Sequence, residues 1–417
     1  MSEFKTYTLE QLCIVGSSKR VHLSDYVQQG IPFYRSKEVI EISSGKNISE
    51  QLFISSEKYS EIKSKFPVPQ ENDVLITAVG TIGEILVVKD PNFYFKDGNL
   101  IWLRNIDFDI IDIDYLYYFL KSDLFQKTIK YNNIGAVQKA LTIDFLKTVK
   151  ITLPSLDNQR KLVSVLKSID KKIQINNQIN QELEAMAKTL YDYWFVQFDF
   201  PDQNGKPYKS SGGKMVYNPE LKREIPEGWG VEKLDSLLKI GKETTNPMKS
   251  PNEEFKYYSI PEFDTTGTYS LQLGESIKSN KFKVEKNDLL VSKLNPWFNR
   301  VIYNLEENAI SSTEFIVWKT FNRFEKNFLY QVATGKEFIE YCTRFATGTS
   351  NSHKRVSPDI MIGFQIPFEK AYIQKFGKII DSIRTQVLQN NEQNQELTQL
   401  RDWLLPMLMN GQVKVER

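Results

Sequence analysis

The sequence contains one unit twice. Residues 176–183 read NNQINQEL and residues 390–397 read NNEQNQEL, so six of eight positions are identical at a shift of 214 residues. Weaker matches keep the same order at shifts of 213 to 215, such as NDVLIT at 72–77 with NDLLVS at 287–292. A shift near half of the 417-residue chain indicates duplication of one unit, not a solenoid. Chance similarity between two helices is the alternative, and the matches outside the helices argue against it.

Each repeat ends in a long predicted helix with seam positions spaced alternately by four and three. In the first helix these positions are Leu162, Leu166, Ile169, Ile173, Asn176, Asn180, Leu183, Ala187, Leu190 and Trp194. In the second helix they are Phe376, Ile380, Ile383, Val387, Asn390, Asn394, Leu397, Arg401, Leu404 and Leu408. Such a sustained spacing is typical of a two-stranded coiled coil. The alternative is that each helix packs only on its own domain.

The seam asparagines bear on the orientation of the two helices. In an antiparallel pair, Asn176 would face Asn394 and Asn180 would face Asn390. Facing amides satisfy each other, whereas an amide facing leucine leaves a buried polar group without a partner. A parallel pair also aligns the asparagines, so the sequence leaves both orientations open. The chain path favours the antiparallel form, because the first helix leads directly to the second globular region.

The antiparallel register predicts further contacts between the two helices. Trp194 would face Phe376, and Arg401 would lie opposite Ile169, extending outward or meeting another subunit. The 33 residues from Leu162 to Trp194 would span about 50 Å at ~1.5 Å per residue. That length exceeds one turn of B-DNA, ~34–36 Å. Two similar domains at the ends of such helices would be held at a fixed distance from each other, so that the helices act as a molecular ruler.

The chain is therefore predicted to be an α+β protein with two similar α/β domains, joined by two long helices that form an antiparallel coiled coil with pseudo-two-fold repetition. Strands are expected at 73–77, 84–89, 99–104, 287–292, 300–305 and 313–319, and amphipathic helices at 114–131 and 326–345. The predicted boundaries are 1–154 (first domain), 155–200 (first spacer helix), 201–228 (linker), 229–367 (second domain) and 368–417 (second spacer helix and C-terminal region).

Composition excludes several function classes. The 54 basic and 52 acidic residues leave a net charge of +2, so nucleic-acid binding would need local patches. Cys13 and Cys342 form no CxxC pair, and His22 and His353 are the only histidines, which argues against disulfide frameworks and metal centres. No apolar run is long enough to span a membrane. We expect a soluble cytoplasmic protein.

Catalytic motifs are also missing from the sequence. There is no GxxxxGK[ST] motif and no GxGxxG opening a helix, and Gly80–Gly83 reads as a short turn. Asn295-Pro296-Trp297-Phe298 resembles the Asn-Pro-Pro-aromatic motif of amino-methyltransferases but lacks the second proline. The chain is therefore expected to be non-catalytic.

Loops at matching places in the two halves are candidates for DNA contact. They combine glycine, for close backbone approach, with side chains that hydrogen-bond base edges and phosphates. The candidates are Arg35, Ser36, Lys37, Gly135, Gln138 and Lys139 in the first half, and Tyr258, Lys293, Arg300, Ser350, Asn351, His353, Lys354 and Arg355 in the second. The alternative is that these are ordinary solvated loops.

Several longer segments resemble the specificity subunits of type I restriction–modification systems. They are LPSLDNQRKLVSVLKSIDKKI, LYDYWFVQFDF, NGKPYKSSGGKMVYNPELKREIPEGW and LRDWLLPMLMNGQVKV. The resemblance implies two target-recognition domains, at 1–154 and 229–367, each reading half of an asymmetric bipartite site in double-stranded DNA. The helices would set the gap and dock two methyltransferase subunits, and through them restriction subunits. S-adenosylmethionine would bind the methyltransferase, leaving this chain without a cofactor, metal or membrane partner.

The two halves depart from each other in one loop. AVGTIGE at 78–84 is replaced by SKLNPWFN at 292–299. DNA-contact residues of one half therefore do not predict those of the other half, and the two half-sites should differ. Two other functions remain open from the sequence. One is a freestanding pseudo-dimeric DNA-binding regulator with no methyltransferase partner, and the other is a coiled-coil scaffold that never contacts DNA.

Overall fold

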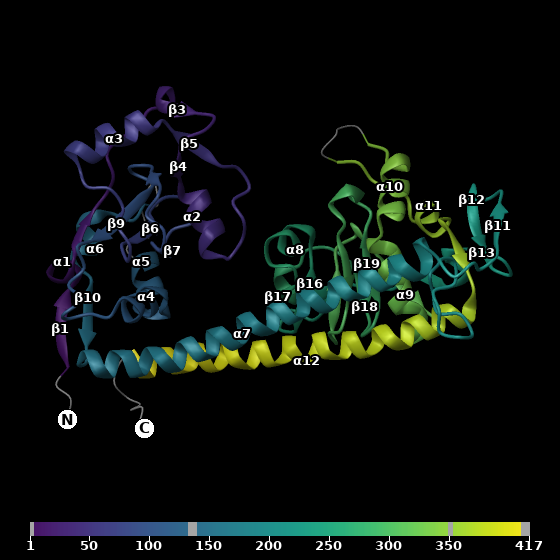
Figure 1. The fold of residues 1–417 in the computed structure, drawn as a ribbon. Helices are drawn as coiled ribbons and strands as arrows, with labels where there is room; N and C mark the ends of the chain where they lie inside the picture. The colour runs from purple at the N-terminus through teal and green to yellow at the C-terminus, as the bar shows by residue number, and fades with distance from the viewer. Residues whose placement is uncertain (1–3, 132–139, 349–352, 410–417) are drawn as a thin grey trace. The chain divides into compact units, whose positions relative to one another are not determined.

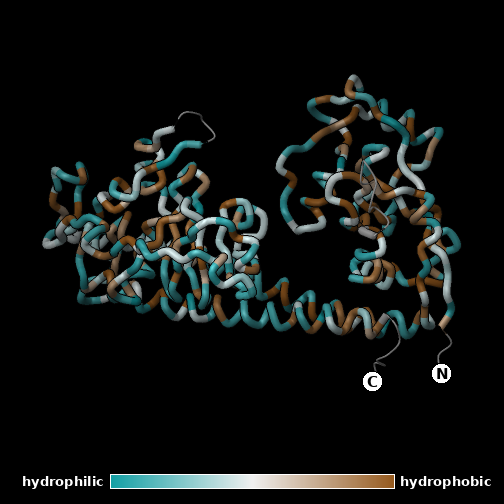
Figure 2. Tube along the Cα trace, turned by 180° about the vertical axis from the view of Figure 1, so that it is seen from behind, coloured by the Kyte–Doolittle hydropathy of each residue, from teal (hydrophilic) through white to brown (hydrophobic). Residues whose placement is uncertain are grey.

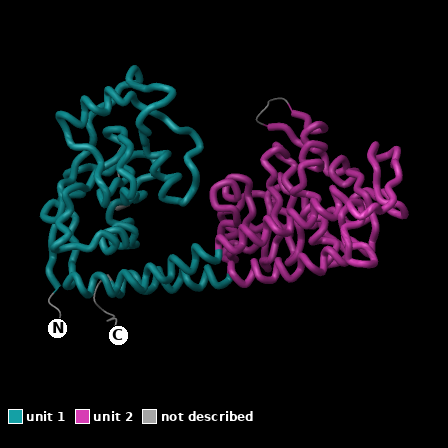
Figure 3. Tube along the Cα trace, viewed as in Figure 1, with its two compact units in different colours: residues 1–176, 392–417 teal, residues 177–391 magenta. Residues whose placement is uncertain are grey.

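A computed structural model describes residues 4–131, 140–348 and 353–409. The chain divides into two compact units, residues 1–176 with 392–417 (unit 1) and residues 177–391 (unit 2), coloured teal and magenta in Figure 3. Each unit contains β-sheets and packed helices (Figure 1). Among the described residues, no helix is both long and apolar enough to cross a membrane.

Unit 1 is built on two small sheets and a separate strand pair. The central sheet has the order β2 (Ile14–Gly16), β9 (Leu100–Arg104), β6 (Val74–Thr77), β7 (Ile85–Val87) and is antiparallel throughout. The second sheet has the order β3 (Tyr26–Val27), β5 (Leu52–Ile54), β4 (Ile31–Tyr34), β8 (Tyr94–Phe95), with β4 and β8 parallel. β1 (Lys5–Thr8) pairs with β10 (Lys150–Leu153), which leads directly into the long helix.

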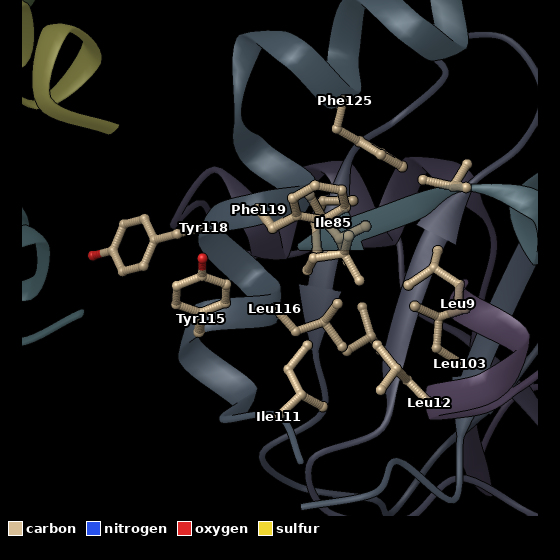
Figure 4. Packing of buried hydrophobic residues seen from close by; sticks show 14 of the residues in the cluster. Leu9, Leu12, Ile85, Leu103, Ile111, Tyr115, Leu116, Tyr118, Phe119 and Phe125 are labelled. Atoms are coloured by element: carbon tan, nitrogen blue, oxygen red, sulfur yellow. The ribbon is translucent and has the colours of Figure 1, made fainter. Parts of the chain in front are cut away.

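Helices cover the central sheet of unit 1 and form its core. They are α1 (Leu9–Leu12), α4 (Ile113–Lys121), α5 (Asp123–Tyr131) and α6 (Ile143–Thr148). Figure 4 shows Phe119 of α4 beside Ile85, within a cluster that includes Leu9 and Leu103. All four side chains are at least nine-tenths buried, and full burial of such an apolar side chain contributes about 1.5–3 kcal/mol. Unit 1 also contains α2 (Ser36–Ser43) and α3 (Ser56–Lys65).

The predicted helix at 114–131 is two helices, and so is the one at 326–345. Ser122 has an extended backbone with ψ of 148° and its Oγ accepts from the backbone N–H of Phe125, so it caps α5. Gly335, also extended with ψ of 146°, separates α9 (Arg323–Thr334) from α10 (Lys336–Phe345) without a side-chain cap. The prediction of one continuous helix in each half was wrong, because one extended residue interrupts the ladder of backbone hydrogen bonds.

Unit 2 repeats the strand order of unit 1. Its central antiparallel sheet runs β14 (Leu238–Gly241), β22 (Phe315–Thr320), β19 (Leu289–Ser292), β20 (Val301–Tyr303). Its second sheet runs β15 (Thr244–Thr245), β18 (Lys281–Val284), β21 (Ala309–Ser311), β16 (Glu254–Tyr258), β17 (Ser270–Leu273). β13 (Gly230–Lys233) pairs with β23 (Gln365–Phe368) as β1 pairs with β10. The internal repeat predicted from the sequence is confirmed, with different edge strands in the second sheets.

Helices of unit 2 meet in an aromatic core. Besides α9 and α10 the unit contains α8 (Ile260–Thr266) and α11 (Pro358–Ile362). Phe195, in a π-helical turn after α7, lies 4.7 Å between ring centroids from Phe328 of α9. The backbone of Gly377 passes so close to α9 that a Cβ there would lie 2.2 Å from the carbonyl oxygen of Phe324. Glycine therefore permits the close packing of α12 on α9 in this unit.

The long helices α7 (Leu156–Tyr191) and α12 (Lys370–Met409) pair in antiparallel fashion within each unit. Hydrophobic and hydrophilic residues alternate along their turns (Figure 2), as expected for helices that bury one stripe. In unit 1, Leu162 and Leu166 share a buried cluster with Leu408. In unit 2, the rings of Trp194 and Phe376 lie 5.9 Å apart, the pair expected from the antiparallel register.

The seam asparagines hydrogen-bond across the helix pair. In unit 1, Asn176 Nδ2 donates to Asn394 Oδ1 at 2.9 Å and to Gln393 Oε1 at 2.8 Å. In unit 2, Asn390 Nδ2 donates to Asn180 Oδ1 at 2.8 Å. Both partners are those of the antiparallel arrangement. The amides therefore hold one register of the seam, because a shifted register would leave them facing apolar side chains.

The segment 201–228, predicted as a linker, has structure of its own in unit 2. β11 (Met215–Asn218) and β12 (Arg223–Pro226) form an antiparallel hairpin. Just before this segment, Phe200 stacks on Trp229 and Tyr208, with ring centroids 5.0 and 4.8 Å away. The aromatic contacts fix the path of the segment against the unit.

Candidate nucleic-acid interface

The same pair of loops meets in both units. In unit 1, Val79, in the loop after β6, forms an isolated β-bridge with Ala140. In unit 2, Leu294, in the loop after β19, forms the equivalent bridge with Arg355. Both bridges therefore join the loop that differs between the halves, 78–84 or 292–299, to the C-terminal end of the segment predicted to contact DNA or to the residue just after it. Each unit presents a composite loop surface at an equivalent place.

Backbone hydrogen bonds hold the unit 2 surface in shape. Asn295 donates its N–H to the carbonyl of Lys354 at 2.7 Å, and Lys354 donates its N–H to Asn295 Oδ1 at 3.0 Å. Lys293 donates its N–H to the carbonyl of Glu314 at 2.9 Å. Three cations, Lys293, Lys354 and Arg355, are thus brought onto two adjoining strands of chain. Clustered cations of this kind suit a phosphate backbone.

Arg355 is held by a carboxylate. Its Nε and Nη2 donate to the Glu314 carboxylate at 2.9 and 3.0 Å, and this hydrogen bonding raises the pKa of the guanidinium. The Arg355 side chain remains 44% exposed. His353 is exposed, and Lys354 is half-buried. These three predicted residues therefore lie together at the surface.

Two other predicted residues of unit 2 point inward. Tyr258 is 3% exposed, its hydroxyl donates to Asn304 Oδ1 at 3.0 Å, and burial raises the pKa of that hydroxyl. Arg300 is 8% exposed and pairs with both carboxylate oxygens of Asp264, at 2.6 and 2.7 Å. Both side chains stabilise the unit and present little polar surface to a ligand. The sequence alone does not distinguish these two buried residues from exposed residues that contact DNA.

The predicted residues of unit 1 begin helix α2. Arg35 donates from its backbone N–H and from Nη2 to the fully buried carboxylate of Glu38, at 2.6 Å each. Burial acts to raise the pKa of Glu38, but the Arg35 hydrogen bonds outweigh it and lower that pKa. Ser36 Oγ donates to the carbonyl of Asn99, and Lys37 lies 3.5 Å from Glu50 with its side chain 50% exposed. Lys37 is thus the most available of the three.

Five predicted residues lie outside the described part of the chain. They are Gly135, Gln138, Lys139, Ser350 and Asn351. Their contact with DNA stays a prediction.

The sequence reasoning missed a charged link within the helix pair of unit 1. Arg401 Nη1 donates to Asp170 Oδ1 at 2.9 Å, and Tyr118 of α4 donates its hydroxyl to Asp170 Oδ2 at 2.6 Å. One carboxylate therefore joins α4, α7 and α12. The only available signal was that an acidic residue flanks the seam position opposite Arg401.

Cys13 and Cys342 are both buried and free of disulfide bonds. Burial raises the pKa of the Cys13 and Cys342 thiols to about 12, so neither forms a thiolate near neutral pH. In residues 4–131, 140–348 and 353–409, no three His, Cys, Asp or Glu side chains are grouped to hold a metal ion.

Two units with the same strand order in their central sheets, paired helices and different loops at equivalent places define a duplicated two-unit protein. Residues 1–185 match the model of the type I restriction modification DNA specificity domain. The chain is 26% identical over 422 residues to the type I restriction enzyme MjaIX specificity subunit of Methanocaldococcus jannaschii, covering 96% of this chain and 91% of that protein. The first 185 residues thus match the type I restriction modification DNA specificity domain, and nearly the whole chain is similar to a type I restriction enzyme specificity subunit.

Two further comparisons agree. A putative type I restriction enzyme specificity subunit of Haemophilus influenzae, S.HindORF215P, is 33% identical over 182 residues, 42% of this chain and 43% of that protein. The crystal structure of the type I restriction–modification S subunit from M. genitalium has the same fold, with a TM-score of 0.52 and 16% identity over 97% of this chain and 96% of that one.

Proposed function

We propose that this chain is the DNA-recognition subunit of a methyltransferase and restriction complex, and that it reads an asymmetric bipartite site in double-stranded DNA. Each unit reads one half-site. The observation that carries this proposal is the repeated composite loop surface, bridged at Val79–Ala140 in one unit and Leu294–Arg355 in the other. Two units with the same sheet framework but different loop sequences would read two different half-sites, because base contacts come from the loops.

The paired helices act as the spacer between half-sites. α7 has 36 residues and α12 has 40, and a helix rises ~1.5 Å per residue, so α7 is about 54 Å long. The asparagine pairs in the seam support a fixed register, since slippage would bury unpaired amides. A fixed register gives a fixed gap between the bases that are read.

The chemistry belongs to the partners. Two methyltransferase subunits dock on this chain in the cytoplasm, flip one adenine in each half-site and methylate it with S-adenosylmethionine that they bind themselves. This chain holds no cofactor, is not an enzyme, and reaches the restriction subunits through the methyltransferases.

The test is methylation mapping in cells. A type I methyltransferase subunit from the source organism of this chain is expressed with and without it, and methylated adenines are read across the genome. The proposal predicts one bipartite motif that depends on this chain, and copurification of the two proteins. A motif that persists without the chain, or sequence-specific footprinting by the chain with no methyltransferase partner, would contradict it; the second result would identify a freestanding regulator.

A further inference from the structure

The loop after β19 in unit 2 exposes two neighbouring aromatic side chains. They lie on a single 3₁₀ turn, Pro296–Phe298, where Trp297 is 38% exposed and Phe298 is 58% exposed. Their ring centroids are 6.0 Å apart. Unit 1 has the glycine loop 78–84 at this place. The exposed aromatic pair therefore belongs to one half of the duplicated protein.

The turn is held rigidly at both ends. Asn295 and Asn299 flank it with φ of 47° and 48°, a left-handed conformation that asparagine tolerates better than most residues. Pro296 fixes the first residue of the turn. The two hydrogen bonds between Asn295 and Lys354 tie the turn to the cationic segment 353–355. The backbone of the turn is thus fixed before binding, and only the rotamers of the exposed side chains remain to be ordered.

One face of Phe298 is already covered. The Arg300 guanidinium lies 4.6 Å from the Phe298 ring centroid and is itself fixed by Asp264. The exposed part of Phe298 therefore lies on its other face and edge. An aromatic ring supported from behind by a fixed guanidinium is suited to stacking on another flat ring.

We propose that Trp297 and Phe298 form an aromatic wedge that stacks against a base-pair step in the half-site read by unit 2. The occupant is duplex DNA, because the turn continues into Lys293 on one side and is bridged to Lys354 and Arg355 on the other. These cations bind the phosphates, and the rings reach the bases between them. The wedge rests on the proposed function and adds that only one of the two half-sites is deformed.

The test uses the full chain with its methyltransferase subunits and duplexes that carry the methylated motif. Phe298→Ala should weaken binding to the motif about tenfold, the loss expected for one aromatic–base stack. The dependence of affinity on salt should not change, because no phosphate contact is lost. 2-Aminopurine placed outside the steps that flank either flipped adenine should fluoresce only in the half-site of unit 2, where the wedge unstacks a step, and the Phe298→Ala complex should lose that signal. Trp297→Ala should act in the same direction.

Phe321→Ala is the matched control. Phe321 is also 58% exposed in unit 2 and also carries a cation, Lys239, 5.2 Å from its ring centroid, but it lies outside the turn. It should leave affinity and fluorescence unchanged. If the Phe298→Ala variant does not fold, Phe298→Leu and Trp297→Ala take its place in the measurements of affinity and fluorescence.

The outcomes separate this inference from the proposed function. Normal motif binding by both alanine variants, or 2-aminopurine fluorescence that persists in them, overturns the wedge. Failure of the unaltered complex to distinguish the motif from random DNA overturns the proposed function itself.

Discussion

Replacing one asparagine of the Asn180–Asn390 pair should lower the free energy of unfolding more than replacing both. Asn390 is 7% exposed and Asn180 is 9% exposed. Asn390 Nδ2 donates to Asn180 Oδ1 at 2.8 Å, and Asn180 Nδ2 donates to Asn391 Oδ1 at 2.8 Å. Asn390→Leu removes the first of these hydrogen bonds and the one that the exposed Gln386 donates to Asn390 Oδ1 at 3.0 Å, and it leaves the buried Asn180 Oδ1 facing a hydrocarbon side chain.

The expected loss of stability follows from these hydrogen bonds and from the burial of the two asparagines. A buried acceptor left without its donor costs about 1–3 kcal/mol, and burial of the new leucine offsets part of this. We expect Asn390→Leu to lower the free energy of unfolding by about 1–2 kcal/mol. The double variant Asn180→Leu/Asn390→Leu places two leucines face to face, and the exposed Asn391 can turn to water. Its stability should equal or exceed that of the unaltered chain.

Urea unfolding followed by circular dichroism measures these differences, provided that the denaturant dependence is the same for all variants. Gln174→Leu, at an exposed polar position on α7, the helix that contains Asn180, is the control and should change stability by less than about 0.5 kcal/mol. The reasoning is refuted if Asn390→Leu costs nothing, or if the double variant loses the sum of the two single losses, because the amides would then not be coupled.

Three other predictions follow from the structure. Gly377→Ala should destabilise unit 2 by about 1–3 kcal/mol in the same assay, because its Cβ would lie 2.2 Å from the Phe324 carbonyl oxygen. Burial raises the pKa of Asp288 to about 6 from 3.8, so the contribution of this carboxyl to the free energy of unfolding should fall by on the order of 2 kcal/mol as pH rises from about 4 to 6, and the stability difference between the unaltered chain and Asp288→Asn should change by that amount. Lys354→Ala should weaken DNA binding by the assembled complex similarly for all sequences and reduce the salt slope by about 1, and an unchanged slope would exclude a phosphate contact. Arg355→Ala should act in the same direction.

The helix pair was predictable because its determinants are local and periodic. Spacings of four and three define the seam, and two asparagines per helix restrict the register to arrangements in which amides meet. Orientation remained open in the sequence, and the 5.9 Å contact between Trp194 and Phe376 identifies it. The helix breaks at Ser122 and Gly335 were missed, although a capping serine and a glycine were both visible as local signals.

The exposure of individual site residues could not be predicted. Arg300 and Tyr258 satisfy their polar groups with Asp264 and Asn304, which lie 36 and 46 residues away in sequence. Only the folded sheets bring such partners together, so a buried arginine and an exposed one look alike in the sequence. The exposed pair Trp297 and Phe298 was read only as a fragment of a catalytic motif, and its flanking left-handed asparagines had no sequence signal beyond their identity.

The central claim is that the length of the helix pair sets the gap between the two bases that are methylated. Three heptads are inserted between Asn180 and Gln181 and three opposite them, between Gln389 and Asn390, which keeps Asn180 facing Asn390. The insertion adds about 31 Å, or about nine base pairs at ~3.4 Å each, close to one turn of B-DNA. Inserting heptads in α7 alone is the control, and should abolish methylation. Genome-wide mapping should find the same half-sites separated by nine or ten more base pairs; an unchanged gap would contradict the account.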